Sequence, residues 1–260
     1  MQIATWNVNS LNARLPHVLD WLAAHPVDVL ALQELKMSDD KFPHAELAAA
    51  GYEAQVHGQK TYNGVALLAR QGLGVDQVQR GIPGLNDDAA RLIAATIPAP
   101  GGPLRIVNGY FVNGQAPDSD KFLYKMHWLT ALGDWLQGEI ARHPRLALMG
   151  DFNIAPEDRD SHDPQALAGA ILHTPEERQH FQRLLALGLH DAFRLFEQPE
   201  RSYSWWDYRQ LSFQKNRGLR IDHILISAPL KPQARACAID RSPRKWPRPS
   251  DHAPVLLTLE

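Results

Sequence analysis

Five short motifs in the sequence put a carboxylate, an amide or an imidazole beside an apolar run of residues. In chain order they are WNVN at 6–9, QE at 33–34, GDFN at 150–153, RID at 220–222 and SDH at 250–252. A single Asp at the end of a strand is usually a capping or turn residue. Five such motifs, rich in oxygen donors, instead favour a site for a hard cation. Mg²⁺ binds one or two carboxylates and keeps several waters, so Glu34 with Asp251 or Asn7 would be a typical ligand set.

Other catalytic signatures are absent from the chain. It contains no G-x-x-x-x-G-K-[ST], G-x-G-x-x-G, H-E-x-x-H or G-x-S-x-G. Four of its twelve histidines stand next to an Asp, namely His162, His190, His223 and His252. Neighbouring residues of a strand face opposite ways, so we interpret the first three as structural or exposed. His252 is the candidate for chemistry, because it lies in a short loop of a chain whose other strand ends are also acidic.

The elements that must position these motifs alternate between strands and helices. Apolar runs predict strands at 3–7, 27–33, 64–69, 91–97, 104–111, 146–149, 221–226 and 255–259. Helical spacing predicts helices at 15–24, 120–142 and 175–188, the last opened by Thr174 and closed by Gly188. No repeat or linker interrupts the pattern. We therefore expect a single α/β domain over residues 1–260, with two packed sheets and helices outside, whose strand ends gather into a site.

The composition is that of a folded protein of ordinary character. Hydrophobic residues make up 44% of the chain and charged residues 22%, which allows a sizeable core and argues against wholesale disorder. Cys237 is the only cysteine, so an intrachain disulfide and a thiolate zinc cluster are excluded. The first residues lack a signal-peptide pattern, and no apolar run of about 18 residues is present to span a membrane. We expect a soluble, cytoplasmic protein of a reducing compartment.

Charge is unevenly distributed along the chain, whose formal net charge is −2. Residues 201–250 hold eleven Lys or Arg and three Asp, whereas the rest holds sixteen basic and twenty-six acidic residues. Such a segment is commonly just a solvated surface, but this one surrounds the last two motifs and so indicates a face for a polyanion. The residues expected to face phosphates are Arg209, Lys215, Arg217 and Arg220 near RID, and Arg241, Arg244, Lys245 and Arg248 before SDH.

Taken together, the blocks resemble the exonuclease III family of abasic-site endonucleases, within the endonuclease/exonuclease/phosphatase superfamily. The matching blocks, in the family order, are WNVNSL, LQELK, GVA after HGQKTYN, NGYFVNGQ, MGDFNIAP, GLRIDHIL and SDHAPV. They span nearly the whole chain. The stretches KFLYK, SWWDYR and GLRID narrow the resemblance to the DNA-repair branch.

This resemblance implies a four-layer sandwich of two mixed β-sheets flanked by helices, and a divalent metal, Mg²⁺ or Mn²⁺. It implies that Glu34, with Asn7 and Asp251 nearby, holds the ion. Asp151 and Asn153 would then position and activate the attacking water.

Three more side chains are assigned by the same resemblance. His252, oriented by Asp222, would polarise the phosphate together with the ion, and Tyr110 would contact or stabilise it. Two questions stay open: whether Asp151 or His252 is the base, and whether one or two ions bind.

The implied partner is double-stranded DNA with abasic sites or 3′ ends, and no membrane. The residues expected to contact it are Arg91, Lys121, Trp205, Arg209, Arg217, Leu219, Arg244 and Lys245. Trp205, Trp206 and Leu219 resemble segments that receive or wedge beside a displaced sugar, although Trp206 could equally be a core residue. Arg91 and Lys121 could equally be ordinary surface residues.

The resemblance ends at residues 155–180, where Leu172 and His173 precede a helix and could crowd the pocket. Abasic-site incision, 3′-end trimming and 3′-phosphate removal therefore stay open. The rival interpretations are a phosphoesterase of the same superfamily that acts on inositol phosphates or sphingolipids, and a DNA-binding or partner-docking module with an inactive site. No coiled-coil pattern is present, which favours a monomer.

Overall fold

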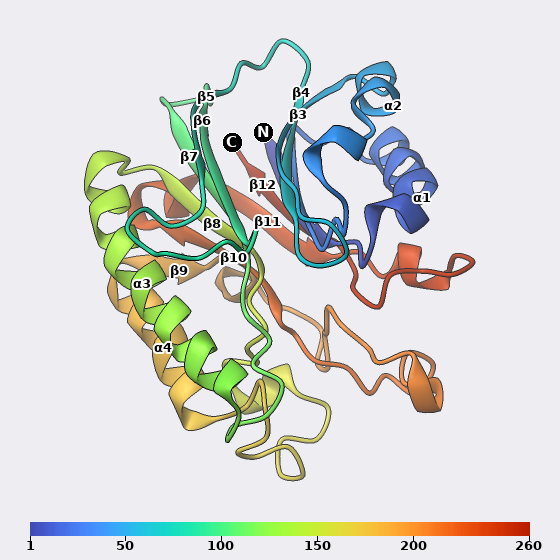
Figure 1. Cartoon of the computed structure of the whole chain (residues 1–260), viewed down its shortest axis with the longest axis vertical. Coiled ribbons are helices and arrows are strands. Elements are labelled where there is room, and N and C mark those ends of the chain that lie inside the picture. Colours follow the sequence, from blue (N-terminus) through green and yellow to red (C-terminus); the bar gives the residue numbers. More distant parts are fainter.

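The computed structural model describes residues 1–260 as two β-sheets that face each other, with helices on the outside (Figure 1). The first sheet has the order β11-β12-β1-β2-β4-β3. Its strands are β1 (Gln2–Asn7), β2 (Val29–Gln33), β3 (Tyr52–His57), β4 (Val65–Arg70), β11 (Ala234–Ile239) and β12 (Val255–Leu259). The second has the order β5-β6-β7-β8-β10-β9. Its strands are β5 (Asp76–Arg80), β6 (Leu92–Ile97), β7 (Leu104–Tyr110), β8 (Leu146–Asp151), β9 (Leu189–Asp191) and β10 (Asp222–Ser227).

Each sheet contains one parallel pair near its centre, β1 with β2 and β7 with β8, and the other neighbours are antiparallel. A parallel pair needs a crossover, and a helix supplies each one. The helices are α1 (Leu11–Ala24), α2 (His44–Ala49), α3 (Asp120–Arg142) and α4 (Pro175–Ala186). In Figure 1, α1 and α2 lie outside the first sheet, and α3 and α4 outside the second. This arrangement confirms the expected four-layer sandwich.

Strand alternation divides the core into three layers, as β1 illustrates. Ile3 packs into the layer between the sheets, together with residues of both. Ala4 and Trp6 point the other way, into the layer under α1, where the ring centroid of Trp6 lies 6.0 Å from that of Trp21. A third layer joins the second sheet to α3 and α4. Because side chains alternate along a strand, every second residue of β1 faces the opposite sheet.

A polar bridge crosses the layer between the sheets. The Gln33 amide nitrogen donates to Thr5 Oγ1 at 2.8 Å and to Asn108 Oδ1 at 2.7 Å. Asn108, on the second sheet, donates in turn to the backbone oxygens of Leu32 and Ala66, both at 2.9 Å. These groups are fully buried and would cost free energy if left unpaired. The bridge therefore fixes how one sheet sits on the other.

The main strands and helices follow the sequence prediction, and the differences have physical causes. Helix α1 begins at Leu11 instead of residue 15, because Leu11 is buried in the outer layer and Pro16 is accommodated within the helix. Helix α2 and strands β3, β5, β9 and β11 were not predicted. Strands β3, β5, β9 and β11 are sheet edges with one neighbour each, so their sequences lack a continuous apolar run. No helix combines the length and the apolar character needed to cross a membrane.

Candidate active site

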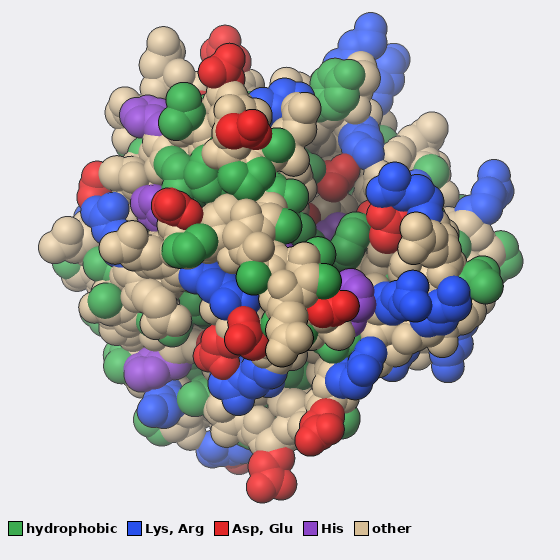
Figure 2. Space-filling view, turned by 90° about the horizontal axis from the view of Figure 1, so that it is seen from below, with side chains coloured by type: hydrophobic (Ala, Val, Ile, Leu, Met, Phe, Trp, Pro, Cys, Tyr) green, Lys and Arg blue, Asp and Glu red, His purple; other side chains and the backbone are tan.

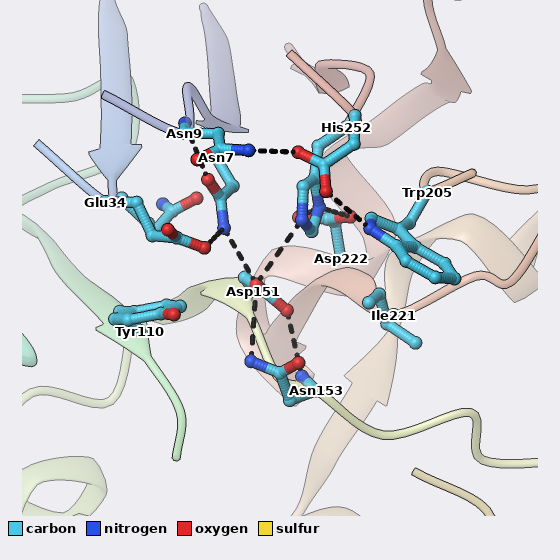
Figure 3. A network of polar contacts seen from close by, with 12 residues as sticks. Asn7, Asn9, Glu34, Tyr110, Asp151, Asn153, Trp205, Ile221, Asp222 and His252 are labelled. Carbon is cyan, nitrogen blue, oxygen red and sulfur yellow. Dashed lines mark hydrogen bonds and ion pairs between the residues drawn. The ribbon is translucent and has the colours of Figure 1, made fainter. Parts of the chain in front are cut away.

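Strand ends from both sheets meet at one end of the sandwich, where Figure 3 shows their side chains pointing toward one another. In the parallel pairs, Asn7 lies opposite Gln33, just before Glu34, and Tyr110 lies opposite Asp151. Antiparallel β10 starts where β8 ends, so Asp222 pairs with Asp151. His252 precedes β12, which runs antiparallel to β1. The topology thus gathers the first, middle and last thirds of the chain into one cluster.

The approach of β7 to β8 depends on a glycine. Gly150 has φ +143°, and a Cβ there would stand 1.9 Å from the backbone oxygen of Gly109. Any side chain would force these two strands apart, and with them Tyr110 and Asp151. The glycine in the GDFN motif is therefore a requirement of the site geometry.

Asn7 joins the carboxylates of the two sheets. Its Nδ2 donates to Glu34 Oε1 and to Asp151 Oδ2, both at 2.9 Å. The other Glu34 oxygen, Oε2, lies 3.0 Å from Lys36 Nζ. Lys36 also donates to Asn9 Oδ1, and Asn9 donates to Asp251 Oδ1 at 2.9 Å. One continuous polar network therefore runs from Asp151 to Asp251.

Asp222 and His252 form a buried pair. His252 Nδ1 lies 2.9 Å from Asp222 Oδ2, which turns the Nε2 edge toward Asp151, with 3.7 Å from Nε2 to Asp151 Oδ2. Burial disfavours the charged ring, but the charges of Asp222 and Asp151 outweigh burial and raise the pKa of His252 to about 10. The expected pairing of Asp222 with His252 is thus present in the geometry, and the imidazole carries a proton at neutral pH.

The carboxylate of Asp151 accepts several hydrogen bonds. Its Oδ1 accepts from the backbone N–H of Asn153 at 2.9 Å, and Asn153 Nδ2 lies 3.3 Å from Oδ2. Asn153 adopts a left-handed backbone with φ +50°, and Asn113 Nδ2 donates to its side-chain oxygen at 3.0 Å. Burial raises the pKa of Asp151 to about 7, with His252 opposing and Asp222 reinforcing the change. The carboxyl is therefore able to exchange a proton near neutral pH.

Tyr110 closes the cluster on the side of the second sheet. Burial, followed by the charges of Glu34 and Asp151, raises the pKa of its hydroxyl well above the ordinary range, so the phenol keeps its proton. The Arg91 guanidinium lies over its ring at 5.1 Å from the centroid. The hydroxyl can therefore act as a hydrogen-bond donor in this acidic surrounding.

The donor set fits a hard cation. Ligand atoms of Glu34, Asp151 and His252 lie within 4.8 Å of one another, and the carboxylate oxygens are of the kind that Mg²⁺ prefers. Asp251, which we also expected near the ion, accepts hydrogen bonds from two protein donors. Its Oδ1 accepts from Asn9 and its Oδ2 from Trp205 Nε1, both at 2.9 Å.

The residues predicted to contact DNA separate into exposed and buried groups. Lys121, Arg209, Arg217 and Lys245 are exposed, and Arg91 and Trp205 are half-buried. On the face shown in Figure 2, Lys and Arg side chains flank a hollow in which acidic and histidine side chains are visible.

Two expected phosphate contacts are wrong because the guanidinium groups are buried. Arg220 is 1% exposed and is paired with Asp160 at 2.6 Å and Asp191 at 2.7 Å. Arg244 is 6% exposed, donates to the backbone oxygen of Ser250 at 2.6 Å and lies over the rings of Trp206 and Phe213.

The apolar residues expected beside the pocket are mostly buried as well. Trp206 is fully buried, so it is a core residue. Leu219 packs with Leu172 in a small cluster that Trp205 borders, and Leu172 has φ +71°. His173 is buried, and its Nε2 has no hydrogen-bond partner. The segment 172–173 thus lies next to the cluster that Trp205 borders.

Sequence reasoning overlooked four polar residues of this network. Asn9, Lys36, Asn113 and Lys125 each contact a predicted site residue or its backbone. All four stand inside the quoted blocks WNVN, LQELK, NGYFVNGQ and KFLYK. Their place within a block was the available signal, but no residue type distinguished them from ordinary surface residues.

The chain is similar to known proteins over nearly its whole length. The model of a family described as the Endonuclease/Exonuclease/phosphatase family matches residues 4–252. The chain is 38% identical to exodeoxyribonuclease III of Haemophilus influenzae, over 98% of either chain. It is similar to a 3′ phosphatase from Neisseria bound to a product DNA hairpin, with 46% identity, a TM-score of 0.96 and coverage of 100% and 99%. An AP endonuclease from Archaeoglobus fulgidus shows 34% identity, a TM-score of 0.93 and the same coverage.

Proposed function

Because this chain belongs to the Endonuclease/Exonuclease/phosphatase family, we propose that it is a DNA-repair hydrolase that cleaves phosphate esters of the DNA backbone. The observation that carries the proposal is the position of Asp151. Asp151 accepts hydrogen bonds from the amides of Asn7 and Asn153 and lies next to the Asp222–His252 pair. Both sheets contribute to this one site, which supports a single catalytic domain.

Glu34 and Asn7, with Asp251 nearby, would hold the divalent ion, Mg²⁺ with Mn²⁺ as a substitute. When bound, the ion supplies Lewis-acid polarisation of the phosphate and neutralises negative charge. Asn7 Nδ2 keeps Glu34 and Asp151 together, and Lys36 holds the second oxygen of Glu34. These contacts fix the carboxylates before substrate arrives.

The pKa values of the two acid/base candidates favour one division of roles. The charges of Asp222 and Asp151 raise the pKa of His252 to about 10, which favours a protonated donor over a base at neutral pH. Asp151, with a pKa of about 7, can accept a proton from the attacking water. The Nε2–H of His252 would donate to a phosphate oxygen, as would the hydroxyl of Tyr110. Asn153 would orient the water beside Asp151.

For the substrate, we propose DNA 3′ ends, with 3′-phosphate removal and 3′-end trimming as the main activities. The likeness to the Neisseria 3′ phosphatase supports this choice, as does the packing of Leu172 against Leu219 beside Trp205. We expect that packing to limit the entry of an extruded abasic sugar. Abasic-site incision is the second candidate, which the likeness to the Archaeoglobus enzyme favours.

The duplex would contact exposed basic side chains. Exposed Lys121, Arg209, Arg217 and Lys245 would hold flanking phosphates without reading sequence. A monomer is sufficient, since all the proposed catalytic groups come from one chain.

The test is cleavage of three duplexes in Mg²⁺, with an EDTA control. They carry a 3′-phosphate at a nick, a recessed undamaged 3′ end and an internal abasic-site analogue. Turnover at the two 3′ ends that exceeds abasic incision at least tenfold would support the proposal. Equal or faster abasic incision would overturn the substrate order, and Leu172→Ala would show whether that side chain limits the pocket. Hydrolysis of a soluble inositol phosphate without cleavage of any duplex would refute the DNA function itself.

A further inference from the structure

Lys125 lies on the first turns of α3 with its side chain fully buried. A buried lysine is rare unless it is paired, and here each ammonium proton has an acceptor. Nζ forms a short ion pair with Glu177 Oε1, and donates to the backbone oxygens of Asn153 at 2.7 Å and Asn113 at 3.1 Å. The ammonium therefore binds three separate segments of the chain at one point.

Two of those segments, at Asn113 and Asn153, are hydrogen-bonded to the active site. Asn113 and Asn153 are also hydrogen-bonded to each other through their side chains, at 3.0 Å. Asn153 holds a left-handed backbone that favours glycine, and it needs that conformation to direct both its backbone N–H and its Nδ2 at Asp151. The backbone carbonyl of Asn153 accepts from Lys125. Lys125 thus holds the peptide that follows the Cα of Asn153, while the N–H of the preceding peptide meets Asp151.

The third segment begins α4. Glu177 Oε2 accepts from the backbone N–H of Thr174 at 3.0 Å and from its hydroxyl at 2.9 Å, and Thr174 Oγ1 accepts from the N–H of Glu177. This is a capping box, whose glutamate is usually exposed but here is fully buried against Lys125. Leu172, just before the cap, accepts a hydrogen bond from the backbone of Ala155 at 2.9 Å. The cap and the Asp151–Asn153 loop are therefore parts of one assembly.

We propose that Lys125 is a positioning residue for hydrolysis, which holds Asn113 and Asn153 so that the amide groups of Asn153 stay on the Asp151 carboxylate. The proposal rests on the function proposed above. Lys125 does not touch the substrate. Loss of its two carbonyl contacts would let the left-handed peptide relax, and a displacement on the order of 1 Å at a catalytic group costs about 100-fold in rate.

The experiment separates this role from simple ion pairing. Lys125→Met leaves the charge of Glu177 unpaired and should destabilise the protein. The double variant Lys125→Met/Glu177→Gln removes both charges, and Gln at this position still completes a capping box. The double variant should therefore regain thermal stability over Lys125→Met. Its kcat on the nicked 3′-phosphate duplex should nevertheless stay about 10- to 100-fold below the unaltered protein, with KM changed less than threefold.

A matched control exists at the other end of the second sheet. Arg105 and Glu139 form a similarly buried ion pair, 2.8 Å apart, at the start of β7, away from Tyr110. Arg105→Met/Glu139→Gln should lower the melting temperature and leave kcat within threefold. Lys125→Arg keeps a cation on Glu177 and should recover part of the lost kcat. These variants are assayed below their melting temperatures, so that a stability loss does not enter kcat.

The outcomes are distinct. A double variant as active as the unaltered protein would show that Lys125 only neutralises Glu177, and the inference would fail. Equal losses of kcat in the Arg105 control would also overturn it, because burial of any ion pair would then explain the effect. If the unaltered protein cleaves no duplex, the proposed function fails first. Retained cleavage with an unaffected double variant refutes the role of Lys125 alone.

Discussion

Replacing Asp222 by Asn should convert His252 from a permanent cation into a neutral ring. Asp222 Oδ2 lies 2.9 Å from His252 Nδ1, and both side chains are buried. An Asn there removes the anionic partner. It also presents either an N–H or an oxygen to Nδ1, so the ring orientation is no longer fixed by charge. The hydrogen-bond donor that faces Asp151 and the substrate is then lost from most molecules at neutral pH.

The size of the effect follows from the pKa of His252. The step from 6.5 to about 10 corresponds to roughly 5 kcal/mol at about 1.4 kcal/mol per pKa unit. Burial works against the charged ring, so Asp222 and Asp151 together supply more than this amount, and Asp222 makes the larger contribution. Because Asp222 supplies the larger part of a contribution that also offsets burial, we expect the pKa of His252 to fall below about 7 in Asp222→Asn. Loss of one charged donor to the reacting phosphate typically lowers kcat about 100- to 1,000-fold.

Two measurements check this reasoning. The ring protons of His252 are titrated by NMR in EDTA, in the unaltered protein and in Asp222→Asn, and phosphate release is measured in Mg²⁺. Asp240→Asn is the control. Asp240 also accompanies a histidine, with 3.7 Å to His25 Nε2, but it lies against α1 and bonds to Trp21. A His252 pKa that stays within one unit of the original, with kcat within threefold, would refute the assignment of a charged His252.

Three other predictions follow from the site. Glu34→Ala should abolish turnover but leave DNA binding in EDTA within threefold, as measured by fluorescence anisotropy; retained turnover would contradict its metal role. Asp151→Asn should be inactive, yet its metal-free form should melt several degrees higher at pH 8. The pKa of Asp151 is raised to about 7, so the stability it contributes is full below about pH 3.8 and is lost as pH rises to 7. An unchanged melting temperature would contradict this sign. Arg209→Ala/Lys245→Ala should weaken binding to all duplexes alike and reduce the salt slope of log K by about 2; an unchanged slope would place the DNA elsewhere.

The sequence was informative about the site because its chemistry lies at strand ends. Asn7, Glu34 and Asp151 follow apolar runs that predict their own strands. Parallel pairing of β1 with β2 brings Asn7 beside Glu34, and the packing of the two sheets brings Asp151 to Asn7. The sequence did not predict which residues form ion pairs with a buried charged side chain. Arg220 resembles an ordinary surface cation in the sequence. In the structure it is buried and paired with Asp160 and Asp191, which are distant in sequence. Local pattern cannot reveal a partner that only the fold supplies.

The fold shows the same division. Strands in the middle of each sheet are buried on both faces, so their sequences are apolar runs that predict them. Strand β5 has the polar sequence DQVQR and forms a strand only by pairing with β6. Lys36 and Lys125 were missed for a related reason. Each is a lysine that a sequence places on the surface by default. Lys36 instead contacts Glu34 of its own loop and Asn9 after β1, and Lys125 contacts Glu177 of α4.

The pairing of β12 with β1 has a consequence for synthesis. Translation delivers Asn7 long before His252, and β12 must insert between β11 and β1 before His252 can reach Asp222. A nascent chain folds from its N-terminus as it emerges. A chain in which β12 is missing or not yet inserted therefore holds its carboxylates without an imidazole in place. Such chains, whether still on the ribosome or truncated before β12, are expected to leave the chromosome uncut, because the site is complete only after β12 has inserted.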